Sequence, residues 1–183
     1  MIVNLSGPGG SGKTTLAEAL QCDDPLRYKM LVTCTNRPMR AGESDGRHYH
    51  FVPAETLVDD NEYILRRVRG NDVYAVRKVD LQAETQVLLT TLPPRGVIKL
   101  EQAGYCPICF YLELAESERV ERMMKRGDRP DLITKRLELD AQESSFASFR
   151  AALASQEFFI LDARKPISNL VDEVEGIVCE HLK

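Results

Sequence analysis

The stretch Gly7-Pro8-Gly9-Gly10-Ser11-Gly12-Lys13-Thr14 decides how this chain folds. It fits the pattern G-x-x-x-x-G-K-[ST] of phosphate-binding loops. The apolar run from Met1 to Leu5 precedes it and has the composition of a buried parallel strand, and an amphipathic helix is expected from Thr15 to Leu20. A strand, a glycine-rich loop and a helix in this order predict an α/β fold, with helices on both faces of a parallel core sheet.

The residue types of this loop suit the binding of a nucleoside triphosphate. Glycines let backbone N–H groups approach phosphate oxygens, and the N-terminus of the following helix adds partial positive charge. Lys13 is expected to reach the β- and γ-phosphates, and the Thr14 hydroxyl is the expected protein ligand of Mg²⁺. We therefore expect ATP to be bound by Gly7, Gly9, Gly10, Ser11, Gly12, Lys13, Thr14 and Thr15.

The composition of the chain argues against several kinds of binding partner. A formal net charge of −4 over 183 residues argues against a dedicated nucleic-acid binder. No apolar run approaches the roughly 20 residues of a membrane span, and the chain enters its first strand directly, so we expect a cytoplasmic protein without a membrane partner. Cys106 and Cys109 have redox or zinc spacing, but no second Cys or His pair matches them, which favours simple buried or strand-entry cysteines.

A second motif extends from Thr35 to Phe51 and reads T-x-R-x-x-R-x-G-E-x-D-G-x-x-Y-x-F. Arg37 and Arg40 flank a proline, and Tyr49 returns on the strand expected at His48 to Val52. Two guanidinium groups and a phenol are suited to binding a second phosphate. The alternative for the two arginines is a pair of solvated surface charges.

Together, the two motifs resemble the guanylate kinase family over most of the chain. The resemblance implies a P-loop kinase formed by a single domain, residues 1–183. Its core would comprise residues 1–32, 87–119 and 141–183, its nucleoside-monophosphate-binding region residues 33–86, and its lid residues 120–140. From the residue pattern we expect a strand over Tyr28–Thr33, a short helix over Glu55–Asn61 and a long helical region over Ile133–Leu153.

The resemblance also implies roles for individual residues. Arg126 and Arg136 match lid arginines that contact the transferred phosphoryl group, and with Lys13 they are the expected catalytic residues. Asp162 falls where the family has an Asn near adenine. The expected acceptor-binding residues are Thr33, Arg37, Arg40, Glu43, Tyr49, Leu65, Arg67, Tyr74 and Val76.

Several positions depart from the family pattern. Leu65, Val76 and Leu92 stand where the family places two carboxylates and a serine that read guanine, and Thr90 is nearest to the usual Mg²⁺-positioning aspartate. Arg66, Arg67 and Arg69 crowd one expected strand, and a solvated strand edge is the simpler explanation for them. The alternative is that Arg67, expected on the same strand face as Leu65, offers donors to carbonyl and ring-nitrogen acceptors of a base. A shift of one residue in the alignment is the alternative explanation.

The sequence thus predicts an enzyme that transfers the γ-phosphoryl group of ATP, with Mg²⁺, to a nucleoside or deoxynucleoside monophosphate whose base differs from guanine. One alternative is guanylate kinase proper, acting on GMP or dGMP. Another is a non-catalytic, guanylate-kinase-like module that binds proteins, but the intact phosphate-binding loop argues against it. The expected partners are ATP and a nucleoside monophosphate, in a monomer or homodimer.

Overall fold

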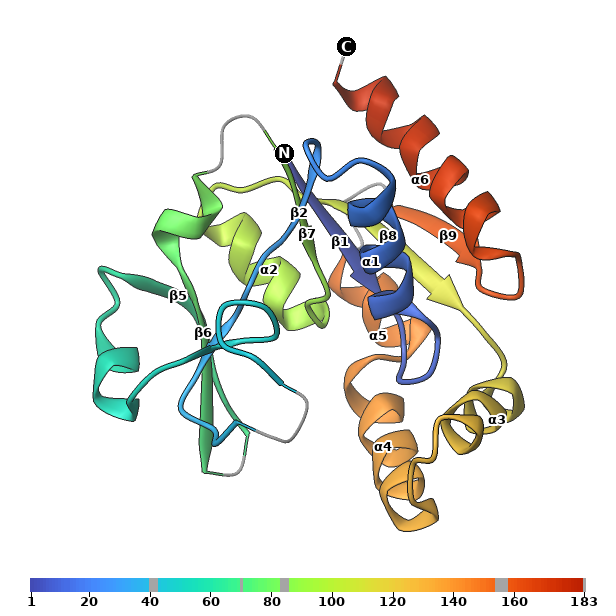
Figure 1. Ribbon diagram of the computed structural model, residues 1–183, viewed down its shortest axis with the longest axis horizontal. Helices are drawn as coiled ribbons and strands as arrows, with labels where there is room; N and C mark the ends of the chain where they lie inside the picture. The colour runs from blue at the N-terminus through green and yellow to red at the C-terminus, as the bar shows by residue number, and fades with distance from the viewer. Residues whose placement is uncertain (40–42, 70, 83–85, 154–157, 183) are drawn as a thin grey trace.

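A parallel sheet forms the centre of the molecule. The computed structural model describes residues 1–39, 43–69, 71–82, 86–153 and 158–182 (Figure 1). In these residues the sheet has five strands in the order β2-β7-β1-β8-β9. Their bounds are β1 Ile2–Ser6, β2 Tyr28–Met30, β7 Val87–Thr90, β8 Ile108–Glu113 and β9 Phe158–Asp162. Because β1 lies between β7 and β8, the loop that follows it opens at the middle of the carboxyl edge, where such sheets bind ligands.

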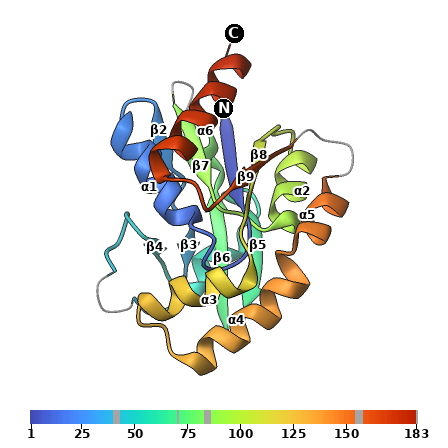
Figure 2. The ribbon, with the colours of Figure 1, turned by 90° about the vertical axis from the view of Figure 1, so that its right-hand side faces the viewer.

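Helices cover both faces of this sheet, as the sequence predicts. Helices α1 (Lys13–Asp23) and α6 (Ile167–His181) lie on one face, and α2 (Pro94–Gln102) and α5 (Phe146–Ala152) on the other (Figure 2). Alternation along β8 produces the two cores, since successive strand residues point to opposite faces. Phe110 and Leu112 pack with α1 and α6, whereas Cys109 and Tyr111 pack with Val97 of α2 and Phe149 of α5.

A second, smaller sheet stands beside the first. Its order is β4-β3-β6-β5, with β3 at Cys34–Thr35, β4 at His50–Phe51, β5 at Tyr63–Arg69 and β6 at Asp72–Arg77. The predicted strand Tyr28–Thr33 is therefore too long: β2 ends at Met30, and the chain crosses to β3 of the other sheet. The predicted short helix is a 3₁₀ turn, η1, over Ala54–Val58, and a second 3₁₀ turn, η2, covers Lys78–Leu81.

Two helices lie beyond the carboxyl edge of the central sheet: α3 (Glu116–Lys125) and α4 (Pro130–Glu143) (Figure 1). The predicted helical region Ile133–Leu153 is divided into α4 and α5, because Ser145 is extended and its hydroxyl accepts the N–H of Ser148, capping α5. Among the described helices, none is both long and apolar enough to cross a membrane.

The two closely spaced cysteines lie in different environments. Cys109 is fully buried on β8, where burial raises the pKa of its thiol to about 12, whereas Cys106 is exposed. In the described part of the chain, no group of three or more His, Cys, Asp or Glu side chains is arranged to hold a metal ion. Cys109 is thus an inert apolar side chain of the core.

Candidate active site

The phosphate-binding loop connects β1 to α1 and needs glycine for its shape. Gly10 and Gly12 have φ angles of 82° and 102°, in the left-handed region that other residues rarely adopt. Gly12 is the N-cap of α1, so the unpaired N–H groups of the first helical turn face the loop. Among the described residues, the buried Ser11 hydroxyl has no hydrogen-bond partner. The loop therefore presents donors suited to an anionic ligand.

The Lys13 side chain folds back onto the loop that precedes it. Its ammonium group donates to the carbonyl oxygens of Gly7 at 2.7 Å and Pro8 at 2.9 Å. Burial lowers the pKa of Lys13 to about 8; Asp140 opposes this shift, whereas Arg136 and Arg119 add to it. The half-buried ammonium group is thus hydrogen-bonded to two backbone carbonyls, and a bound phosphate would favour its charged form.

A cavity of about 740 Å³ lies between this loop, helices α3 and α4, and the segments that follow β7 and β9. The exposed Thr14 lies in its wall, where its hydroxyl would be accessible to a Mg²⁺ ion, and water and nucleotide phosphates would supply the remaining ligands. Residues of both the loop and the predicted lid line the cavity: Gly7, Gly9, Gly10, Ser11, Gly12, Lys13, Thr14, Thr15, Arg122, Arg126, Arg136 and Asp140.

Both predicted lid arginines reach this cavity, and both are paired with the same carboxylate. Arg126 forms two hydrogen bonds to Asp128, and Arg136 Nη1 lies 3.4 Å from Asp128 Oδ2. Hydrogen bonding to Arg126 holds the pKa of Asp128 below its usual value and raises that of Arg126. The two arginines are therefore held close together by an internal anion.

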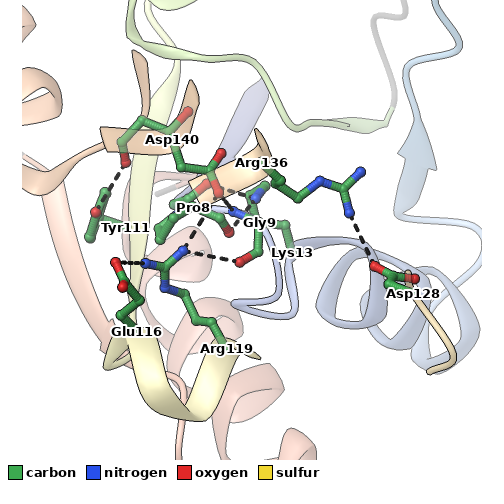
Figure 3. A network of polar contacts seen from close by, with 11 residues as sticks. Pro8, Gly9, Lys13, Tyr111, Glu116, Arg119, Asp128, Arg136 and Asp140 are labelled. Atoms are coloured by element: carbon green, nitrogen blue, oxygen red, sulfur yellow. Dashed lines mark hydrogen bonds and ion pairs between the residues drawn. The ribbon is translucent and has the colours of Figure 1, made fainter. Parts of the chain in front are cut away.

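Three further charged residues of this site were missed by sequence reasoning. Arg122 Nη2 donates to Ala163 O at 2.7 Å, and Arg119 and Asp140 both contact Gly9 of the loop (Figure 3). The helical spacing of Arg119, Arg122 and Arg126 was the available signal for the arginines. No comparable signal marked Asp140, which lies far from the loop in sequence.

Thr90 belongs to a buried network rather than to the cavity wall. Its hydroxyl donates to Asn4 Oδ1 at 2.7 Å, and the same oxygen accepts the N–H of Leu92 at 2.8 Å. The Asn4 amide donates in turn to Ser6 Oγ at 2.8 Å. Thr90 is 3 % exposed, so it joins β7 to β1 in place of a metal-positioning carboxylate.

On the second sheet, Arg37 is held in a fixed orientation. It is 6 % exposed, its Nη1 and Nη2 donate to Glu43 at 2.9 and 2.7 Å, and its guanidinium lies 5.0 Å from the ring centroid of Tyr49. Glu43 raises the pKa of Arg37 further. Tyr74 packs edge-on against Tyr49. This group is separate from the residues that line the cavity. Thr33 is half-buried and its carbonyl accepts the N–H of His50 at 2.9 Å, whereas Arg40 lies outside the described residues.

The residues expected near the base are mostly buried. Leu65 and Val76, 9 % and 1 % exposed, pack in one apolar cluster with partly buried Leu92 at its edge. Leu65 has a φ of 60° where the register of β5 shifts, a strained conformation for a leucine. This bulge interrupts the alternation that would place Arg67 on the face of Leu65. Arg67 is exposed, lies over the Tyr74 ring and lines the cavity.

Asp162, expected near adenine, pairs with a neighbour. Its two oxygens accept Arg164 Nε and Nη2, each at 2.8 Å, and these bonds lower the pKa of Asp162 to about 2. The cavity wall in this region is formed instead by Ala163, Lys165, Ile167 and Leu170.

Comparisons with known proteins agree with this architecture. The family model described as Guanylate kinase matches residues 1–159. The guanylate kinase of Cupriavidus metallidurans is 32% identical over 174 residues, which cover 90% of this chain and 79% of the relative. That of Mycoplasmoides gallisepticum is 29% identical over 151 residues, covering 78% and 77% respectively.

The fold is shared with a solved structure. The crystal structure of guanylate kinase from Anaplasma phagocytophilum aligns with a TM-score of 0.67 and 18% identity, covering 99% of this chain and 85% of the other. The family-model match covers most of the chain, including the phosphate-binding loop, the Arg37 motif and the helices of the predicted lid. The chain belongs to the guanylate kinase family.

Proposed function

We propose that this chain is an ATP-dependent guanylate kinase, which transfers the γ-phosphoryl group of ATP to GMP or dGMP. The single observation that supports transfer best is the cavity in which the phosphate-binding loop faces Arg126 and Arg136. Phosphoryl transfer needs positive charge around the transferred group and in-line geometry more than it needs a strong base. The naming of the relatives supports the choice of guanine.

The donor side of the mechanism follows from the contacts of the loop. Lys13 exchanges the carbonyls of Gly7 and Pro8 for phosphate oxygens, which have the stronger negative charge. Arg126 and Arg136 exchange Asp128 for the transferred group. Thr14 would hold Mg²⁺, which neutralises charge on the donor phosphates when bound.

The acceptor side is assigned to the second sheet. Arg37 is proposed to bind the phosphate of the monophosphate with its planar fork, together with Tyr49, Tyr74 and Arg40. Thr33 and Glu43 complete the predicted set beside the base. The region 33–86 would then act as the monophosphate-binding part and residues 120–140 as the lid.

A second candidate differs in the base. Leu65 and Val76 are apolar and buried, so neither can accept the N–H groups of guanine, which favours a base with more carbonyl acceptors. However, the O6 and N7 atoms of guanine are themselves acceptors that suit the donors of Arg67. Arg67 therefore fits guanine as well, and the naming of the relatives supports guanine over the second candidate.

The test is a comparison of kcat/KM for GMP, dGMP, AMP, CMP, UMP and dTMP at saturating ATP. We expect a guanine nucleotide to be preferred by roughly tenfold or more. Arg67→Ala should reduce that preference, whereas Arg66→Ala, which removes the same charge from the neighbouring exposed position, should leave it unchanged. A preference for a pyrimidine nucleotide would support the second candidate, and transfer to no nucleotide would support the protein-binding module.

A further inference from the structure

The phosphate-binding loop already holds an anion that belongs to the chain. Asp140, on helix α4, places its Oδ2 atom 2.6 Å from the backbone nitrogen of Gly9 (Figure 3). The same oxygen lies 3.5 Å from Nη1 of Arg119, on helix α3. An N–H of this loop is the type of donor that binds phosphate oxygens. The carboxylate therefore occupies a position suited to an oxygen of the donor nucleotide.

The surroundings of Asp140 are those of a bound phosphate. Its side chain is 16% exposed, and the cations Lys13, Arg119 and Arg136 all lie close to it. Arg119 is buried, donates weakly to Gly9 O at 3.4 Å, and its Nε has no partner among the described residues. Arg119 also pairs with the exposed Glu116 at 3.5 Å, and Arg136 with Asp128 at 3.4 Å. Removal of the Asp140 charge would leave three cations beside the loop with less counter-charge, a deficit that an added anion would relieve.

Close packing fixes α4 in this position. A methyl group built on Gly9 would lie 2.5 Å from Arg136 Cδ and 2.9 Å from Asp140 Oδ2, so the helix rests directly on the loop. Arg136 and Asp140 are four residues apart and project from the same face of α4. A movement of α4 that withdraws Asp140 from Gly9 therefore also moves Arg136.

We propose that Asp140 is a further residue of the donor site, which sets its affinity for ATP: in the nucleotide-free chain its carboxylate occupies an anion position of the phosphate-binding loop, and the phosphates of ATP must displace it. This inference rests on the proposed function only in taking ATP as the ligand. The measured affinity for ATP then equals the intrinsic affinity of the open loop multiplied by the fraction of molecules in which Asp140 has left the loop.

A purely structural role for Asp140 makes a different prediction. If the carboxylate served only to join α4 to Arg119 of α3, its loss would destabilise the chain and would not strengthen ATP binding. Competition between Asp140 and ATP instead predicts that loss of the carboxylate lowers the stability of the chain and raises its affinity for ATP. The variant should be less stable without nucleotide, since an internal contact is lost, and should bind ATP more tightly.

The experiment compares the wild-type chain with Asp140→Asn, Asp140→Ala and Glu138→Gln. Asp140→Asn keeps the size of the side chain, so it guards against loss of the fold in the alanine variant. Glu138 is exposed on the same helix, two residues away, and its substitution changes the net charge equally. Calorimetry at fixed salt gives the dissociation constant for ATP with Mg²⁺, and thermal unfolding with and without ATP reports stability.

We expect both Asp140 variants to bind ATP roughly tenfold more tightly than the wild type, the effect of removing a charged competitor for one backbone N–H. Glu138→Gln should change binding less than twofold. Equal or weaker ATP binding by folded Asp140→Asn overturns the inference and leaves the proposed function intact. If the Asp140 variants bind ATP about tenfold more tightly but the wild-type chain phosphorylates no acceptor, the proposed function alone is overturned. If none of the four proteins binds ATP, both the inference and the proposed function are overturned.

Discussion

Replacement of Arg37 by Lys is the sharpest test of the acceptor site. The change keeps the positive charge and removes the planar fork that now forms two hydrogen bonds to Glu43, at 2.9 and 2.7 Å. An ammonium group cannot reproduce that fork on a phosphate. A hydrogen bond to a charged group contributes about 1.5–3 kcal/mol, so kcat/KM for the acceptor should fall by roughly 10- to 150-fold.

The assay is steady-state kinetics with the acceptor varied at saturating ATP, combined with the dissociation constant of ATP measured separately. Arg77→Lys is the matched control, because Arg77 forms a comparable fork with Asp80 at 2.7 and 2.9 Å on the same sheet. Its loss should affect stability without affecting the acceptor. The ATP dissociation constant should change less than twofold in both variants, since the donor loop belongs to the other sheet.

Three outcomes would refute this reasoning. Equal weakening of ATP and acceptor in Arg37→Lys would assign Arg37 to the donor site or to the structural frame. An equal loss of acceptor kcat/KM in Arg77→Lys would mean that the sheet as a whole, rather than Arg37, determines acceptor binding. An unchanged kcat/KM in a folded Arg37→Lys protein would remove Arg37 from the site.

Three more predictions concern the loop and the network beneath it. Burial lowers the pKa of Lys13 to about 8 and a phosphate favours the charged amine, so ATP binding should take up a proton above about pH 8 and weaken from about pH 7 to about pH 9. Calorimetry in buffers of different ionisation enthalpy measures this proton uptake, which Lys13→Met should abolish. Thr90→Val should lower the free energy of unfolding by about 1 kcal/mol in urea denaturation and leave the Mg²⁺ dependence of the rate unchanged, because its hydroxyl bonds Asn4. Gly9→Ala should lower kcat by roughly tenfold or more in a single-turnover assay, because the new methyl group displaces Arg136. It should also lower the free energy of unfolding, because the same methyl group pushes Asp140 away from Gly9; unchanged kcat would contradict the packing on the loop.

The parts of the fold that sequence reasoning predicts well are those with local causes. The phosphate-binding loop is predictable because Gly10 and Gly12 adopt angles that few other residues tolerate. The two covered faces of the sheet follow from apolar strands such as β8. The division between α4 and α5 also has a local cause, the cap at Ser145, but helical periodicity alone does not reveal it.

The parts that could not be predicted depend on contacts between distant segments. Asp140 meets Gly9 across 131 positions of the chain, and nothing near either residue indicates the contact. The bulge at Leu65 interrupts strand alternation, so the faces assigned to Leu65 and Arg67 by counting were unreliable. Both features lie beside the cavity, where local preferences give way to the requirements of a site.

Transfer of a labelled phosphoryl group shows whether the phosphate-binding loop and the predicted lid act as proposed. The chain is incubated with Mg²⁺, ATP labelled at the γ-phosphate and each common nucleoside monophosphate in turn. We expect a labelled nucleoside diphosphate and one ADP for each molecule formed, at a rate that falls by roughly a hundredfold or more in folded Lys13→Ala. The absence of labelled diphosphate with every monophosphate, or full activity without the Lys13 amine, would contradict it.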